Sequence, residues 1–224
     1  KGSIPARGLS GQVYKGAVFW DTEMFMLPFF EATQPALARS LVMYRIHTLP
    51  GARRKARSLG YRGAFYAWES QDSGDEACTR FNVTDVITGR PIRTYFADKQ
   101  VHISADVALA VWSYTRSTAD ESVLLEGGAE VIFECARFFL SYCYFSPDRQ
   151  RYELLDVTGP DEYHERVHNN AYTSAVARET VRVALQAADL LGHKHPEALR
   201  RLMAKLRFAA DLEALRDLAA RLYV

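Results

Sequence analysis

The chain has 224 residues, the size of one large domain, and 48% of them are apolar, which is enough to build a sizeable core. Its 28 basic and 27 acidic residues leave a net charge of +1, so the charge gives no basis for binding nucleic acid or an anionic membrane. The three cysteines, Cys78, Cys135 and Cys143, follow no metal-binding spacing and fit a reducing compartment such as the cytoplasm.

The first predicted helices carry their own start and stop signals. Asp21-Thr22 is expected to cap a helix that runs through Leu27. A second helix is predicted over residues 35–47, because a proline fits its first turn. Pro50-Gly51 is expected to interrupt that helix.

A basic helix is then expected to resume and to end at Ser58. Its run Arg53-Arg54-Lys55 predicts a solvated helix face. Residues 60–100 contain four glycines and a proline and predict a long loop, and a loop of this length inside a compact domain is usually functional.

The second half of the chain predicts helices joined by short connections. Apolar residues at helical spacing predict buried helices over residues 103–114 and 123–143, and a short β-hairpin is expected within residues 144–155. Three further helices are predicted at about 169–192, 196–207 and 209–222. Paired helices without a parallel-strand signal predict an all-α toroid of helical hairpins.

Three loop segments, residues 19–23, 61–70 and 158–165, combine aromatic rings with carboxylates. A sugar-cleaving site needs flat rings for the C–H faces of the sugar, carboxylates for its hydroxyls and an acid to protonate the departing oxygen. The pairs Trp20-Asp21 and Trp68-Glu69 therefore predict a pyranose pocket. For Trp20-Asp21 alone, the competing interpretation is a buried tryptophan beside a helix-capping aspartate.

The turn Gly159-Pro160-Asp161-Glu162 presents a carboxyl group just before a helix. In a partly buried aromatic setting the pKa of Glu162 would rise, and the protonated acid could donate to a leaving-group oxygen. The competing interpretation is an ordinary turn with a solvated carboxylate. His164 and His168 are four residues apart, but no third ligand follows at a supporting spacing, so no metal is expected. Asn169-Asn170 is better explained as the cap of the next helix.

Four segments together resemble a known family. They are Gly16-Ala17-Val18-Phe19-Trp20-Asp21-Thr22-Glu23, Trp68-Glu69-Ser70, Ser104-Ala105-Asp106-Val107-Ala108 and Gly159-Pro160-Asp161-Glu162-Tyr163-His164-Glu165. In this order they resemble the central domain of glycoside hydrolase family 65, which contains the maltose, trehalose, kojibiose and nigerose phosphorylases and related trehalases. The resemblance extends from about Ala6 to Tyr223, and Ala67 stands where many members have proline.

The resemblance implies that residues 1–224 are a fragment of an (α/α)6 catalytic domain, a partial toroid with long active-site loops and a short β-hairpin. The N-terminal β-sandwich, the rest of the barrel and the C-terminal sheet domain are then expected to be absent from this chain. The family's Lys-Gln pair for the glucose and its phosphate-binding residues are expected further downstream. Lys99-Gln100 lies upstream of the acid and is not that pair.

The same resemblance implies roles for six residues: Glu162 as the general acid, Trp20, Asp21, Trp68 and Glu69 around the glucosyl unit, and His164 in substrate binding. The implied reaction is inverting phosphorolysis of an α-glucosidic disaccharide to β-glucose 1-phosphate and a free acceptor sugar. Inorganic phosphate is the co-substrate and no cofactor is expected. Residues 71–93, which directly follow the second tryptophan–acid pair, are expected to select the acceptor.

The parent enzyme is expected to be a cytoplasmic homodimer with no nucleic-acid or membrane partner. Two alternatives stay open at this point. One is inverting hydrolysis by a trehalase-like member, and the other is a non-catalytic sugar-binding or helical module.

Overall fold

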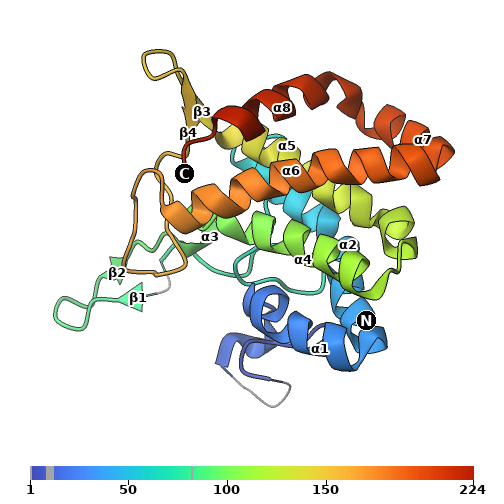
Figure 1. Ribbon diagram of the computed structural model, residues 1–224. Helices are drawn as coiled ribbons and strands as arrows, with labels where there is room; N and C mark the ends of the chain where they lie inside the picture. The colour runs from blue at the N-terminus through green and yellow to red at the C-terminus, as the bar shows by residue number, and fades with distance from the viewer. Residues whose placement is uncertain (1, 9–12, 82) are drawn as a thin grey trace.

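Helices that start at a loop-rich end of the molecule alternate with helices that return to it (Figure 1). The computed structural model describes residues 2–8, 13–81 and 83–224. In chain order the helical elements are η1 (Val13–Gly16), η2 (Thr22–Met26), α1 (Leu27–Thr33), α2 (Pro35–Ser58), α3 (Phe96–Lys99), α4 (His102–Thr118), η3 (Leu124–Gly128), α5 (Ala129–Tyr142), α6 (Ala171–Lys194), α7 (Pro196–Leu206), η4 (Phe208–Asp211) and α8 (Leu212–Arg221). Helices α4 and α6 both begin beside the long loops and pack against each other, while α5 and α8 run back toward those loops.

The core lies where α2, α4, α5 and α6 face one another. Helix α5 contributes an apolar stripe whose side chains are fully buried: Val131, Ile132, Cys135, Phe138 and Phe139. The ring of Phe138 stacks on Phe65 with 4.9 Å between centroids, which ties the loop after α2 to this helix. Among the described residues, no helix has both the length and the apolar character of a membrane span.

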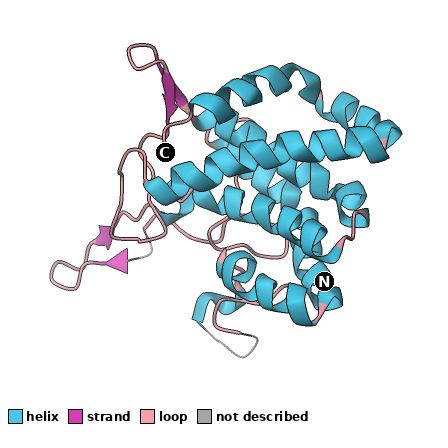
Figure 2. Ribbon diagram, in the orientation of Figure 1, coloured by secondary structure: helices cyan, strands magenta, loops and turns pink. Residues whose placement is uncertain are grey.

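Two small antiparallel hairpins stand out from the helices (Figure 2). Strands β1 (Val83–Thr84) and β2 (Pro91–Ile92) pair within the long loop, with Val83 opposite Ile92. Strands β3 (Tyr144–Ser146) and β4 (Arg151–Glu153) form the hairpin predicted after α5, with Phe145 opposite Tyr152. The predicted all-α class, with helical hairpins, long loops and a short β-hairpin, is confirmed.

Helix α2 is continuous from Pro35 to Ser58, so the predicted interruption at Pro50-Gly51 is wrong. Pro50 lies on the exposed side of the helix, whereas Leu49 and Ala52 on either side of it are buried. Packing of those buried residues outweighs the backbone hydrogen bond that a proline cannot donate.

The basic run Arg53-Arg54-Lys55 does not form one solvated face, and that prediction is wrong. Successive helical residues point about 100° apart, so three neighbours meet three environments. Arg53 pairs with Glu130 and Glu134 of α5, Arg54 is exposed, and Lys55 is buried.

Candidate active site

The two tryptophan–acid segments meet in space although they are far apart in the sequence. Val18 and Ser70 exchange both backbone hydrogen bonds, at 2.9 Å and 3.0 Å. Next to this bridge the ring of Phe19 meets the ring of Trp68 edge-on, with 4.9 Å between centroids. The structure therefore brings the first and second predicted segments into one site.

The first segment ends in a π-helical turn, η2, of the kind often found at functional sites. Glu23 in this turn binds the Arg45 guanidinium through both carboxylate oxygens, at 2.8 Å and 2.7 Å, and Arg45 also donates to the Phe19 carbonyl at 3.0 Å. Asp21 precedes the turn with helical backbone angles and makes no side-chain cap to it, so the predicted capping role is wrong. The half-buried Asp21 carboxylate thus stays available to a ligand.

Trp68 is buried, and its ring stacks on Phe96 with 4.8 Å between centroids. Glu69, the next residue, is half-buried. Burial raises the pKa of the Glu69 carboxyl, the nearby Glu76 raises it further, and Lys15 lowers it. The second segment therefore places a half-buried carboxyl group directly after a buried aromatic residue.

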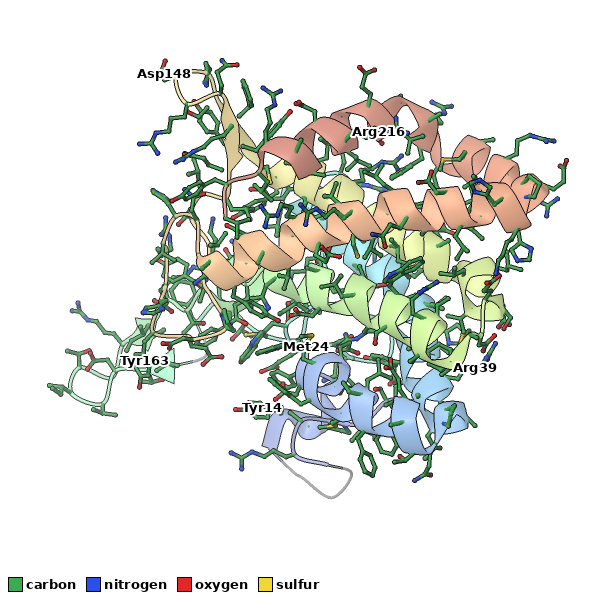
Figure 3. The ribbon with its side chains drawn as sticks, viewed as in Figure 1. Tyr14, Met24, Arg39, Asp148, Tyr163 and Arg216 are labelled. Atoms are coloured by element: carbon green, nitrogen blue, oxygen red, sulfur yellow. The ribbon has the colours of Figure 1, made fainter. Side chains whose placement is uncertain are left out.

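Glu162 lies near the tip of a loop whose base is tightly hydrogen-bonded. Val157 and Val167 exchange backbone hydrogen bonds of 2.9 Å, and the Thr158 amide donates to the Lys99 carbonyl at 2.9 Å. The neighbouring residue Tyr163 is almost fully exposed, at the loop-rich end of the molecule (Figure 3). The backbone thus holds the loop while leaving Glu162 and Tyr163 accessible.

Partial removal from water raises the pKa of Glu162. The neighbouring Gln100 side chain lowers this pKa, and the negative charges of Asp21 and Glu165 raise it. Such charge effects fade beyond about 10 Å, so the third predicted segment lies in the same region of the molecule as the first. A carboxyl group with a raised pKa keeps its proton closer to neutral pH, as a general acid requires.

Sequence reasoning missed a buried polar network beneath Trp20. The His102 ring lies 5.0 Å from the Trp20 ring, edge to face, and its Nδ1 is 2.7 Å from Asp106 Oδ2. Tyr172 of α6 donates its hydroxyl to Asp106 Oδ1 at 2.8 Å. The i,i+4 spacing of His102 and Asp106 on a helix was the signal that could have revealed the pair.

Sequence reasoning also missed Gln100. It considered this residue only in order to state that Lys99-Gln100 is not the family's Lys-Gln pair. Gln100 is 1% exposed and lies close enough to Glu162 to lower the pKa of that carboxyl group, but neither heteroatom of its amide makes a well-formed hydrogen bond with the described residues. His102 Nε2 and Thr158 Oγ1 are likewise buried without a partner in the described part of the chain. Buried polar atoms are normally satisfied, so these groups mark places where a sugar hydroxyl or water can bind.

The two histidines of the Glu162 loop behave differently from a metal pair. His164 has a side chain that is 65% exposed, and its Nδ1 is 3.8 Å from Asp161 Oδ2. His168 Nδ1 accepts the Asp156 amide at 3.0 Å, so this ring fastens the loop. No cluster of three or more metal-ligating side chains occurs among the described residues. Asn170 accepts the Thr173 amide at 3.0 Å, which confirms the predicted cap of α6.

Comparison with known proteins places this site in context. Nigerose phosphorylase of Lachnoclostridium phytofermentans is 54% identical over 222 residues, which is 99% of this chain and 30% of that protein. The 1,2-alpha-glucosylglycerol phosphorylase of Bacillus selenitireducens is 48% identical over 99% of this chain and 29% of that protein. Kojibiose phosphorylase of Halothermothrix orenii is 45% identical over 93% of this chain and 27% of that protein.

A solved structure of a kojibiose phosphorylase candidate from the human microbiome has the same fold, with a TM-score of 0.84 at 26% identity, over 99% of this chain and 30% of that chain. This likeness confirms the expected mostly helical fold. The chain spans about 30% of the length of these curated relatives. The family model of the glycosyl hydrolase family 65 central catalytic domain matches residues 1–224, so the chain belongs to this family.

Proposed function

We propose that the complete protein containing this chain phosphorolyses an α-glucosidic disaccharide with inversion, releasing β-glucose 1-phosphate and a free acceptor sugar. The observation that supports the proposal is that the two tryptophan–acid segments are joined in space and that Glu162, whose pKa is raised, lies near enough to Asp21 to feel its charge. The names of the relatives, which are phosphorylases of nigerose, kojibiose and glucosylglycerol, support phosphate as the nucleophile.

In this reaction Glu162 donates its proton to the oxygen that bridges the two sugars. The bond from the anomeric carbon to that oxygen breaks, and the acceptor sugar leaves as an alcohol. A phosphate oxygen forms the new bond from the opposite face, which inverts the anomeric centre. Phosphate takes the place of both the water and the base of an inverting hydrolase, so one catalytic carboxyl group is sufficient.

The glucosyl unit would be surrounded by Trp20, Asp21, Trp68 and Glu69. The aromatic rings would lie against its C–H faces, and the carboxylates would bind its hydroxyls. His164, which is exposed on the same loop as Glu162, would contact the substrate from the solvent side. No cofactor enters this scheme, because proton transfer and displacement by phosphate complete the reaction.

The proposal extends to the setting of the chain. Residues 1–224 would form part of an (α/α)6 catalytic domain, and the phosphate-binding groups would come from the adjoining part of that domain. Maltose belongs to the substrate class to be tested. A cytoplasmic homodimer is proposed, with the thiols of Cys135 and Cys143 in keeping with a reducing compartment.

The test uses the full-length protein with a panel of nigerose, kojibiose, maltose, trehalose and glucosylglycerol. Each substrate is incubated with and without inorganic phosphate, and products are followed by anomer-resolving NMR. We expect β-glucose 1-phosphate to form from at least one substrate only when phosphate is present. Release of free glucose at a rate independent of phosphate would instead establish hydrolysis, and no turnover of any member would favour a binding module.

A further inference from the structure

One carboxylate, that of Glu76, holds the backbone of the segment that carries Trp68 and Glu69. Its Oε2 accepts the Trp68 amide at 2.7 Å, and its Oε1 accepts the amides of Glu69 at 2.9 Å and Cys78 at 3.2 Å. Hydrogen bonds to an ionised acceptor are shorter and stronger than those between neutral groups. Glu76 therefore fixes the two peptide planes that orient Trp68 and Glu69.

Lys55 of α2 supplies the opposite charge. Its Nζ lies 2.7 Å from Glu76 Oε2, donates to the Tyr66 carbonyl at 3.1 Å, and sits 3.8 Å from the centre of the Phe65 ring. The two side chains are only 7% and 14% exposed. A buried ion pair stabilises a fold little more than packed apolar side chains would, so stability alone is a weak reason for this arrangement.

A close backbone approach brings the loop onto the helix at this point. Gly51 lies one turn before Lys55, and Gly74 lies two residues before Glu76. A Cβ atom on Gly51 would overlap the Gly74 backbone, and one on Gly74 would overlap the Thr48 carbonyl. Gly74 also has a positive φ of 76°, which side chains disfavour. The two glycines thus allow Glu76 and Lys55 to meet.

The same loop is joined to the first tryptophan–acid segment. Ser70 pairs with Glu76 on one side and with Val18 on the other, in two antiparallel bridges. Val18 lies two residues before Trp20. Movement of Glu76 would therefore be transmitted to both predicted sugar-binding segments.

We propose that Glu76, with Lys55 as its counter-charge, is a positioning residue that sets Trp68 and Glu69 against the glucosyl unit. This inference rests on the proposed function and concerns the same site. Glu76 uses its carboxylate on the protein backbone and acts on the substrate only through its neighbours. Misplacing substrate-positioning groups by about 1 Å can cost about 100-fold in rate, and we expect a loss of that order in kcat/KM for the disaccharide. The KM for phosphate is expected to stay unchanged.

The test compares Glu76→Gln, Lys55→Met and the double variant in the full-length protein. Glu76→Gln removes one acceptor and leaves the Lys55 charge buried and unpaired, so both Tm and kcat/KM are expected to fall. Adding Lys55→Met removes the unpaired charge, so Tm should recover. At least one of the backbone amides still lacks its acceptor, so kcat/KM should stay about 100-fold low. Recovery of kcat/KM together with Tm would show a merely structural role and overturn the inference.

Asp120→Asn is the matched control. Asp120 is a loop carboxylate of the same kind, which accepts the Ser122 amide at 3.1 Å and the Tyr114 hydroxyl at 3.0 Å and pairs with Arg39 at 3.3 Å. It lies just beyond the far end of α4, and the site lies at the start of that helix. Its loss should lower Tm without changing kcat/KM.

All variants are assayed in parallel with phosphate and with water as nucleophile. If Glu76→Gln does not accumulate in folded form, the comparison of the double variant with Lys55→Met decides the matter. Wild-type turnover with water alone would overturn the proposed phosphorolysis, and the same variants would still decide the role of Glu76. Wild-type phosphorolysis with an unchanged kcat/KM in Glu76→Gln would overturn the positioning role alone.

Discussion

The hydroxyl of Tyr44 lies 2.8 Å from the hydroxyl of Ser70 in the buried interior and also donates to the Gln71 carbonyl at 3.0 Å. Ser70 directly follows Trp68-Glu69, so a residue in the middle of α2 is attached to the candidate site. The next residue of α2, Arg45, binds Glu23 of the first segment, and Lys55, about three turns further along the helix, binds Glu76. The consequences of this arrangement can be measured.

Replacing the proposed general acid should abolish most turnover without disturbing the fold. Glu162→Gln is expected to lower kcat for disaccharide phosphorolysis by about 10²–10⁴-fold, because a glutamine cannot protonate the leaving oxygen. Glu162 is exposed, so Tm should hold. A substrate with a good leaving group, such as an activated aryl glucoside, should recover part of the lost rate. Retention of most activity on the natural disaccharide would show that another group is the acid.

The pH profile should report the effect of the Asp21 charge on Glu162. The negative charge of Asp21 helps to raise the pKa of Glu162, so Asp21→Asn should lower that pKa. Activity needs the protonated acid, so the alkaline limb of log kcat/KM against pH should move to lower pH in the variant. Glu213→Gln on α8 is a control that removes a negative charge elsewhere. If the alkaline limb does not move in Asp21→Asn, the charge of Asp21 has no effect on the acid that limits activity, and the prediction is wrong.

Two glycine-to-alanine changes in helices should have opposite effects on stability. In an open helix alanine is favoured over glycine by about 1 kcal/mol, and Gly192→Ala in α6 should raise stability by that amount because the new Cβ meets only Leu199 Cδ2, at 3.6 Å. In α2 the Cβ of Gly51→Ala would overlap the Gly74 backbone, and overpacking typically costs about 1–3 kcal/mol. Thermal unfolding of the two variants is the measurement. A stabilised Gly51→Ala variant would mean that the loop yields readily.

Substrate choice should divide between two parts of the chain. Asp21→Ala and Glu69→Ala are expected to impair every disaccharide, because all share the glucosyl unit. Shortening the β1–β2 hairpin, whose tip residues Val86 and Ile87 are almost fully exposed, should change the acceptor preference instead. Relative kcat/KM values over the disaccharide panel test the division. It fails if the hairpin variant loses activity uniformly and Asp21→Ala changes preference.

Much of the site could be predicted from sequence because its groups sit in three short segments rich in aromatic and acidic residues. Most helices and the cap at Asn170 could also be predicted from the local sequence pattern, since both depend on residues that are neighbours in the chain. The continuity of α2 through Pro50 could not be predicted, because long-range packing decides it. Lys55 was wrongly predicted to be solvated for the same reason, because its partner Glu76 lies 21 residues away along the chain. Gln100 and His102 were missed because only the folded chain shows that they are buried without a full set of partners.

The Glu76–Lys55 ion pair also marks the point in the chain after which loop length and sequence can vary without disturbing the candidate site. Around it, residues 66–78 are bound to α2, to the segment around Trp20 and to one another. Beyond it, the chain leaves for the exposed hairpin and returns through the Thr94 amide, which donates to the Arg80 carbonyl at 2.9 Å. An insertion or deletion inside that hairpin would be confined by its own closed base. A lineage of such enzymes could therefore exchange one acceptor sugar for another while the glucose pocket kept its shape.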